Sequence, residues 1–585
     1  MNINKELNKI CSILLAKTIK DLYPDCTIGD AFIGDQLANE SGFSYCFKLE
    51  KRLSITDLPM ILKQMHKNID RAFLITYKTI SKKEALELFK DNKFKIELIN
   101  DCTNDTIEIV SFGDEFNDIC EKTSIAKLSA IKQIKLINIA GEYWKHNAKN
   151  EQLQAITGIA FENAKDLEEY EAIAKDRSER DHRNINSEME LFSFDELVGP
   201  GLPFWMPNGA AIKYEIDDYV HKLLQRNGYD YVQTPVLGTQ QLYETSGHWF
   251  HYRENMFSPL ELDKVVELLR PMTCPHHILC YKMKPKSYKE LPFRVYEDAI
   301  LHRYESSGSL TGLERVRQMR LIDCHMICTP NQIKNVVMQH YKIIEEAAQT
   351  FNIKLSGIQL ALHDVNNKEK FFDNEPLWQQ AENKVREVLK SMGKKEGVDY
   401  YEAIGEAAFY GPKIDMEIKT ALGRNITAFT IQLDFLLPEK FNLEYIDEKG
   451  KISRPVLVHA SVIGTLERFM SILLEQNKGI FPLWLAPQQV QIIPVDIKTH
   501  GKYCAKLVKR LLNELIRSKC DERDERLAKK IRDAQIKKIP YQLVIGDNEI
   551  KNKTISFRKY GSEKSEELKL SKFISMLKKE VKIKK

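Results

Sequence analysis

Two short stretches of this chain carry side chains that could hold a nucleotide. In Arg303-Tyr304-Glu305 an arginine and a glutamate stand two residues apart, which places both on one face of a strand. The second stretch, GTLERF at 464–469, follows about 160 residues later. Arginine binds phosphate through two nitrogens and keeps its charge, and a carboxylate can accept a hydrogen bond from the amino group of adenine. Taken singly, an Arg-x-Glu step is typical of a solvated ion pair, and Glu-Arg-Phe of a helix face.

The length and composition indicate a folded chain of several domains. At 585 residues the chain is too long for one core. With 43% hydrophobic and 29% charged residues it is too apolar for a disordered protein. The net charge is only +4, but residues 486–585 hold 26 basic and 13 acidic side chains. That segment is therefore +13 and the remainder −9. A basic end on an acidic body is expected where the C-terminal part meets a polyanion such as RNA, although a lysine-rich solvated surface gives the same count.

The cysteines and the hydropathy pattern favour a cytoplasmic location. Eleven cysteines are scattered with no CxxC pair, which fits a reducing compartment better than a disulfide framework. At the N-terminus apolar residues recur at helical spacing between Lys9 and Lys17, as in an amphipathic helix rather than a signal peptide. No run approaches the roughly 20 apolar residues of a membrane span, so no membrane partner is expected.

Periodicity and breaker residues predict the organisation of the chain. Residues 1–165 mix helical and strand patterns and are expected to form one α+β domain. Residues 166–196 are highly charged with apolar positions at helical spacing, which predicts a long connecting helix. The segment LVGPGLP at 197–203 ends it and opens the largest domain, at 197–484. Residues 485–585 alternate strand and helix patterns, which predicts a small α/β domain with a parallel component.

Further blocks in the same order narrow the nucleotide hypothesis to one family. They are TSGHW at 245–249, RPMTCPHH at 270–277, FYGPKID at 409–415, FTIQLDF at 429–435 and FPLWLAPQQV at 481–490. With the first two stretches, which resemble motifs 2 and 3 of class II aminoacyl-tRNA synthetases, they resemble threonyl-tRNA synthetases of the bacterial type. The resemblance implies an α+β multidomain protein: a class II antiparallel-sheet catalytic core, a C-terminal α/β anticodon-binding domain, and an N-terminal α+β domain of the editing kind.

The resemblance also implies a reaction and its partners. The implied reaction is ATP-dependent attachment of L-threonine to tRNA(Thr) through threonyl-adenylate. The implied enzyme is a homodimer, with Pro235 at the dimer interface, that uses Mg²⁺ with ATP and one Zn²⁺ per subunit. The implied catalytic residues are Arg303, Lys413, Arg468 and His248, the last beside the 3′ end of tRNA. The implied ATP-binding residues are Arg303, Glu305, Arg315, Met319, Thr427, Thr430 and Arg468. The implied amino-acid-binding residues are Met272, Asp323, Tyr410 and Gln432.

A zinc site is implied at three positions far apart in the sequence. Cys274, His325 and His459 each fall inside a matching block, although a lone cysteine or histidine on a strand is more often part of the core. Three protein ligands leave zinc an open position, as in catalytic sites. In this family that opening takes the amino and hydroxyl groups of threonine, which excludes valine but discriminates only weakly against serine.

Several positions depart from the usual pattern of the family. Met319 stands where an aromatic residue would stack on adenine, Leu321 where a glutamine would touch the substrate, and Ala460 where an arginine follows the third zinc ligand. We therefore expect the zinc site to be kept more faithfully than the contacts to threonine and ATP.

The N-terminal domain departs furthest. From the resemblance we expect the ubiquitin-like domain that begins many relatives to be absent. The histidine pair of the family's hydrolytic site aligns with Lys9 and Ile13; Cys120 is kept, and the histidine beyond it is Ser124. Lysine and isoleucine cannot replace bases that titrate near neutral pH, so we expect a degenerate editing domain that does not hydrolyse Ser-tRNA(Thr).

The implied anticodon contacts are altered in part, and two other functions remain open. Glu549 and Arg558 match the family, whereas Asp524 and Lys538 replace asparagine and arginine. A synthetase-like protein that binds tRNA without catalysis is one alternative. A class II synthetase for serine or proline is another, and it would lack the full set of cysteine and histidine ligands.

Overall fold

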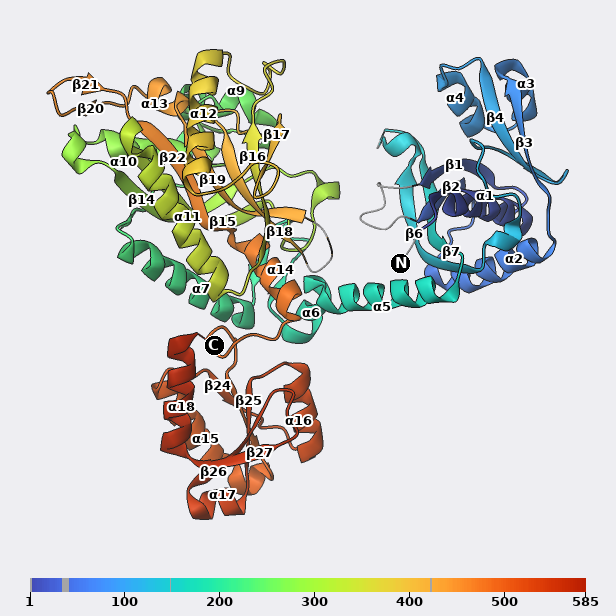
Figure 1. The fold of residues 1–585 in the computed structure, drawn as a ribbon. Helices are drawn as coiled ribbons and strands as arrows, with labels where there is room; N and C mark the ends of the chain where they lie inside the picture. Colours follow the sequence, from blue (N-terminus) through green and yellow to red (C-terminus); the bar gives the residue numbers. More distant parts are fainter. Residues whose placement is uncertain (1–2, 34–41, 148, 421–422, 424, 585) are drawn as a thin grey trace. The chain divides into compact units, whose positions relative to one another are not determined.

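Two compact units make up the computed structural model, which describes residues 3–33, 42–147, 149–420, 423 and 425–584 (Figure 1). The units are Met1–Asp176 and Arg177–Lys585. Among the described residues no helix combines the length and the apolar character that a membrane crossing requires.

The N-terminal unit packs helix α1 against a four-stranded sheet. The sheet order is β1-β2-β7-β6, and a second sheet has the order β3-β4-β5. Apolar residues of α1 and β2, such as Leu14 and Phe43, are fully buried in the same cluster. The elements are α1 Lys5–Leu22, β1 Thr27–Ile33, β2 Phe43–Lys48, α2 Leu58–Asp70, β3 Ile75–Ser81, α3 Lys82–Leu88, α4 Lys93–Asp101, β4 Thr106–Phe112, β5 Phe116–Ile119, β6 Gln133–Tyr143 and β7 Gln152–Phe161.

An eight-stranded, mainly antiparallel sheet forms the centre of the second unit. Its order is β10-β14-β15-β22-β19-β18-β16-β17, and only the two edge pairs are parallel. The strands are β10 Asp230–Tyr231, β14 Phe293–His302, β15 Gln318–Cys328, β16 Leu355–Leu362, β17 Tyr401–Ile404, β18 Lys413–Lys419, β19 Asn425–Asp434 and β22 Val456–Thr465. The edge strand β10 ends at Tyr231, before Pro235.

Alternation along β15 gives the sheet two different faces. Ile322, Cys324 and Met326 are buried in the main hydrophobic cluster with helix α11. Because successive strand residues point to opposite faces, Asp323 and His325 lie on the other face. Figure 1 shows α11 and α12 across the first face, so the second face remains for a site.

Helices and short strands complete this part of the chain. The helices are α7 Pro207–Arg226, α8 Gln240–Thr245, α9 His248–His251, α10 Cys274–Lys282, α11 Ile333–Thr350, α12 Glu375–Ser391, α13 Leu436–Lys440 and α14 Leu466–Asn477. The short strands are β8 Phe192–Ser193, β9 Phe204–Trp205, β11 Leu237–Thr239, β12 Leu260–Leu262, β13 Val265–Leu269, β20 Tyr445–Ile446 and β21 Ile452–Ser453.

The connecting segment is two helices rather than the single helix predicted over 166–196. α5 spans Ala164–Arg180 and α6 spans His182–Met189. Between them Asp181 leaves the helical conformation, and its carboxylate accepts a hydrogen bond from the backbone N–H of Arg183 at 2.8 Å. A new helix therefore starts at an aspartate cap.

The C-terminal part, orange to red in Figure 1, is a five-stranded sheet with helices on both faces. Its order is β24-β23-β25-β26-β27, and β23 pairs in parallel with both β24 and β25, as predicted. The elements are β23 Val490–Pro494, α15 Ile497–Asn513, β24 Ser518–Cys520, α16 Leu527–Ile536, β25 Tyr541–Ile545, α17 Asp547–Asn552, β26 Thr554–Lys559, β27 Ser565–Lys569 and α18 Leu570–Ile583.

Candidate active site and metal-ligand cluster

A cavity of about 500 Å³ opens on the face of the large sheet that α11 leaves uncovered. Two residues that depart from the family pattern, Leu321 and Ala460, line it. It also gathers most of the predicted site residues, namely Met272, Cys274, Arg303, Asp323, His325, Tyr410, Lys413, Thr427, Thr430, Gln432, His459 and Arg468.

Strand register explains why residues so distant in sequence meet. His325 on β15 pairs with His459 on β22, His459 pairs with Gln432 on β19, and Gln432 pairs with Lys413 on β18. Directly paired residues point to the same face of a sheet. These four side chains therefore form one row across the floor of the cavity.

A cysteine and two histidines meet at one end of this row. The ligand atoms of Cys274, His325 and His459 all lie within 4.8 Å of one another, and all three residues are buried. Cys274 is the first residue of α10, so its position depends on where that helix begins. Cysteine and histidine are the ligands that Zn²⁺ prefers.

Hydrogen bonds on the outer side of the cluster fix where the ring protons lie. His459 Nε2 is 2.8 Å from a carboxylate oxygen of buried Asp434, so this nitrogen donates. His277 Nε2 donates to Glu297 at 3.1 Å in the same way. With one proton on each ring, His277 Nδ1 then accepts from His325 Nδ1, 2.8 Å away.

Two unprotonated nitrogens consequently face each other inside the cluster. His325 Nε2 and His459 Nδ1 are 2.9 Å apart, and neither holds a proton in this arrangement. Burial lowers the pKa of His325 well below its ordinary value, which opposes a charged ring. Two facing lone pairs repel unless a cation stands between them. The donor set and its outer partners therefore fit a metal ion.

The residues that hold the two histidines were not singled out from the sequence. Burial would raise the pKa of Glu297, but hydrogen bonds from His277, Arg270 and Thr234 hold it at about 2. Arg270 is itself 1% exposed and donates to Glu297 at 2.8 Å. The available signal was the adjacency of Arg270 and His277 to Cys274 within RPMTCPHH.

Three cationic side chains also line the cavity. Arg303 and Arg468 line it together with Lys413, whose ammonium lies 2.8 Å from Asp415. The guanidinium of Arg468 donates to the backbone oxygen of Glu314 at 3.2 Å. Three cations beside a half-buried hollow can accommodate phosphate groups.

Other polar groups that line the cavity could orient a small substrate. The Tyr410 ring stacks on His459 at 4.7 Å, and its hydroxyl donates to Gln432 at 2.6 Å. Asp323 accepts a hydrogen bond from the hydroxyl of Thr273, and burial raises the pKa of the Asp323 carboxyl. The carboxylate of Asp323 and the amide of Gln432, next to the metal-ligand cluster, can form hydrogen bonds with a hydroxyl and an amino group of a substrate.

The chain's sequence matches two known domain families. The sequence model described as "tRNA synthetase class II core domain (G, H, P, S and T)" matches residues 262–477, and the "Anticodon binding domain" matches residues 489–580. A threonine–tRNA ligase of Ureaplasma parvum serovar 3 is 47% identical over the whole of this chain and 99% of its own length. The chain belongs to the threonine–tRNA ligase family. It is an enzyme, a ligase of the aminoacyl-tRNA synthetase class.

Other members agree in sequence and in fold. A threonine–tRNA ligase of Staphylococcus carnosus is 44% identical over 98% of this chain and 87% of its own length. A crystal structure entitled as the RNA binding domain of threonyl-tRNA synthetase from Cryptosporidium parvum Iowa II is 33% identical, with a TM-score of 0.64, and covers 68% of this chain and 98% of that one. The predicted fold, a class II synthetase core with an anticodon-binding domain, is confirmed.

Four predicted residues of the family's site lie outside the cavity lining. His248 is fully buried behind it, 3.1 Å from the sulfur of Met272, and burial lowers the pKa of His248 to about 3. Met319 is 6% exposed and packs in a small apolar cluster. Glu305 and Arg315 pair with each other at 3.1 Å. Their roles toward ATP and tRNA stay predictions.

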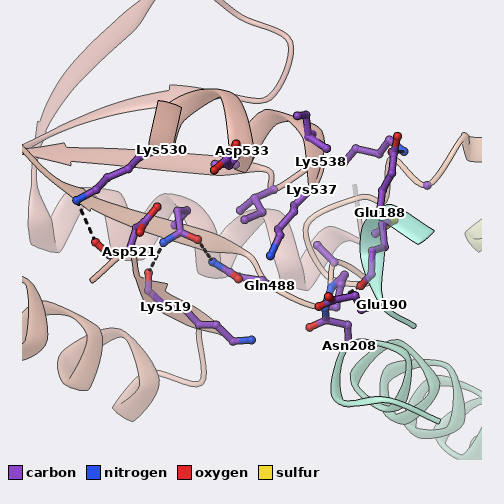
Figure 2. A pocket seen from close by; sticks show the side chains of 18 of the residues that line it. Glu188, Glu190, Asn208, Gln488, Lys519, Asp521, Lys530, Asp533, Lys537 and Lys538 are labelled. Carbon is purple, nitrogen blue, oxygen red and sulfur yellow. Dashed lines mark hydrogen bonds and ion pairs between the residues drawn. The ribbon is translucent and has the colours of Figure 1, made fainter. Parts of the chain in front are cut away.

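A second cavity, of about 480 Å³, lies between the anticodon-binding domain and residues of α6 and α7, among them Glu188 and Asn208 (Figure 2). Lys538, a predicted anticodon contact, lines it and pairs with Glu188 at 3.1 Å. Lys519, Lys530 and Lys537 line it as well. The other three predicted contacts lie elsewhere in the domain, at Asp524, Glu549 and Arg558.

Proposed function

We propose that this ligase activates L-threonine with ATP to give threonyl-adenylate and then transfers the threonyl group to tRNA(Thr). The observation that carries the proposal is that one cavity is lined both by the cysteine-histidine cluster and by Arg303, Lys413 and Arg468. An amino acid held at the cluster presents its carboxylate to a phosphate held by these cations.

Amino acid selection rests on Cys274, His325 and His459 as ligands of one Zn²⁺. The facing lone pairs of the two histidines support this assignment. When bound there, zinc supplies a Lewis acid with a position open to the amino and hydroxyl groups of threonine. Asp323 accepts the substrate hydroxyl, and Met272, Tyr410 and Gln432 line the space around it. Valine offers no hydroxyl and is rejected, whereas serine differs by one methyl group and is rejected only about 10- to 200-fold.

Activation needs the negative charge of ATP to be neutralised. Arg303 takes the amino acid carboxylate and the α-phosphate, and Arg315 takes the terminal phosphates. Arg468 takes the γ-phosphate and the adenine face, while Glu305 reads the adenine edge. Mg²⁺ enters with ATP and supplies further positive charge. Thr427 and Thr430 line the same cavity, which supports a nucleotide there.

Transfer requires tRNA to reach the same cavity. The excess of 26 basic over 13 acidic residues in 486–585 supports contact with RNA by the anticodon-binding domain. Asp524, Lys538, Glu549 and Arg558 are proposed to contact the anticodon. His248 is proposed to assist deprotonation of the ribose hydroxyl. Because His248 is fully buried, it can act on the ribose hydroxyl only through groups that lie between the two.

An apolar groove supports a homodimer. It has a volume of about 610 Å³ and is lined by Pro235, Leu237, Leu279 and Met283, among others. Met283 is 78% exposed and Leu279 40% exposed. A second copy that covered this groove would remove that apolar surface from water.

The N-terminal unit is proposed to lack hydrolytic activity. Ile13 is 1% exposed in the apolar core, and Lys9 pairs with Glu121 at 2.7 Å. Burial raises the pKa of the Cys120 thiol to about 12, so it is not a nucleophilic thiolate. Ser124 donates to Glu6 and offers no base. Neither a general base nor an activated nucleophile is available among these residues.

The first test is amino-acid-dependent ATP–pyrophosphate exchange by metal-analysed protein, with threonine, serine and valine. We expect threonine to dominate, serine to be weak and valine silent, with about one zinc per chain. Exchange with none of them would favour a tRNA-binding protein without catalysis. Serine activity above threonine, or no bound zinc, would contradict the selection mechanism.

The second test concerns the N-terminal unit. The protein is incubated with preformed Ser-tRNA(Thr), and deacylation is compared with the rate in buffer. Equal rates are expected. Rapid hydrolysis would contradict the proposed loss of editing.

A further inference from the structure

The break between α5 and α6 places a histidine inside the catalytic part of the chain. His182, the first residue of α6, is 2% exposed although its neighbours in sequence are mostly charged. Its imidazole bridges two segments that are far apart in sequence. Nδ1 is 2.8 Å from a carboxylate oxygen of Glu475 near the end of α14, and Nε2 is 3.1 Å from the backbone nitrogen of Leu313.

The two partners fix the tautomer of this histidine. A backbone N–H can only donate, so Nε2 accepts from Leu313 and carries no proton. Nδ1 therefore carries the proton and donates to the Glu475 carboxylate, which is 3% exposed. Both hydrogen bonds are buried, and loss of either would leave an unsatisfied group away from water.

Leu313 lies at the tip of a tight turn in the loop between β14 and β15. The turn is closed by the backbone N–H groups of Glu314 and Arg315, which donate to the Thr311 oxygen at 2.9 and 3.3 Å. Arg468, at the other end of α14, donates to the Glu314 oxygen at 3.2 Å. The turn is thus held at two successive residues, once by His182 and once by a proposed ATP-binding arginine.

The packing around the imidazole leaves no room for variation at the turn. Gly312 has a φ of +46°, and a Cβ added there would lie 2.1 Å from His182 Nε2. On the other side Arg180 donates to the backbone oxygens of Glu475 and Gln476, at 3.3 and 3.1 Å. The end of the connecting segment therefore grips both the end of α14 and the turn.

We propose that His182 is a positioning residue for ATP: through Leu313 and Glu475 it sets the turn that carries Arg315 against the helix that carries Arg468. The inference rests on the proposed function, since it takes these two arginines as the phosphate-binding groups. It assigns His182 no contact with substrate. The expected signature is a weaker use of ATP with threonine binding unchanged, because Leu313 and Glu475, the residues that His182 holds, are not among those that line the cavity around the metal-ligand cluster.

Two substitutions separate the two hydrogen bonds. Asparagine places an amide near the position of Nδ1, so His182→Asn keeps a donor for Glu475 and leaves the Leu313 N–H without an acceptor. Glutamine reaches the position of Nε2, so His182→Gln keeps the acceptor for Leu313. Asn184→Ala, on the exposed side of α6 where the side chain donates to Ser178, is the matched control.

The experiment is ATP–pyrophosphate exchange with full-length protein, varying ATP and threonine separately. We expect His182→Asn to raise KM for ATP about tenfold, the effect of one unsatisfied buried N–H. KM for threonine and zinc content should stay close to wild type, while the lost buried hydrogen bond should lower the unfolding midpoint. His182→Gln should recover most of the loss, and Asn184→Ala should behave as wild type.

Three results would overturn the inference. They are an unchanged KM for ATP in His182→Asn, an equal rise in KM for threonine, or a glutamine variant no better than the asparagine variant. If the unmodified protein supports no exchange, the proposed function fails instead. Calorimetric titration of the same proteins with ATP then decides the positioning role by the same tenfold criterion.

Discussion

Replacing Asp434 by asparagine should weaken zinc binding through the tautomer of a ligand that it does not displace. The Asp434 carboxylate caps α13, where one oxygen accepts from the N–H groups of Leu436 and Leu437 at 2.8 and 2.9 Å. Its other oxygen accepts from His459 Nε2 at 2.8 Å. An asparagine can keep the first two bonds through its oxygen, but its NH₂ group then faces the N–H of His459.

Two facing donors are relieved only if the ring proton moves to Nδ1, the nitrogen that points into the cluster. That nitrogen can no longer bind a metal. Loss of such an outer partner typically costs 10- to 100-fold in metal affinity, or about 1.4 to 2.8 kcal/mol. Competition with a chromophoric zinc chelator measures this directly.

Asp496 offers a matched control for this substitution. Its carboxylate also caps a helix, accepting from the N–H groups of Lys498 and Thr499, and lies in the anticodon-binding domain. Asp496→Asn should leave zinc affinity unchanged. If Asp434→Asn binds zinc as tightly as wild type, the proton assignment in the cluster is wrong.

Three further predictions concern stability and substrate use. Burial lowers the pKa of His340 to about 3 from 6.5. The unfolded chain therefore binds a proton that the folded chain does not, so the free energy of unfolding is highest above pH 6.5 and falls by about 1.4 kcal/mol per pH unit below it. His340→Gln should flatten the fall of the calorimetric midpoint between pH 7 and 5. Lys95 and Asp118 form a buried ion pair, with side chains 1% and 0% exposed. Lys95→Met should lower the free energy of unfolding of the N-terminal unit by about 3 to 5 kcal/mol. Lys90→Met, in an exposed pair, should lower it by under about 1 kcal/mol, and chemical denaturation measures both. Tyr410→Phe removes a 2.6 Å hydrogen bond to the neighbouring glutamine and should raise KM for threonine several-fold with KM for ATP unchanged in exchange assays; an equal rise for both would contradict its placement.

Local patterns predicted elements better than their limits. The alternation in residues 485–585 predicted a parallel component, and β23 does pair in parallel with β24 and β25. Helix α15 begins at Ile497 because Asp496 caps it, a limit that periodicity does not mark. The break at Asp181 has the same origin, since a single aspartate decided where one helix ended and the next began.

The site could not be predicted from local patterns, because it depends on register. His325 and His459 face each other only because β15 and β22 pair in one alignment, and a shift of β15 by one residue would turn His325 to the other face of the sheet. Family resemblance supplied the three ligands but not Asp434 or His277, whose roles come from hydrogen bonds across the sheet. His182 was missed for the same reason, as its partners lie more than 130 residues further along the chain.

The close approach of His182 to Gly312 also constrains how this chain can change over generations. A Cβ at position 312 would lie 2.1 Å from the imidazole of His182 and collide with it. Gly312 therefore cannot be substituted while the histidine remains. A lineage could acquire a larger residue at 312 only after replacing the histidine, and thus only by passing through an ancestor whose turn had lost its anchor. Two positions separated by 130 residues are thereby expected to be inherited as a pair.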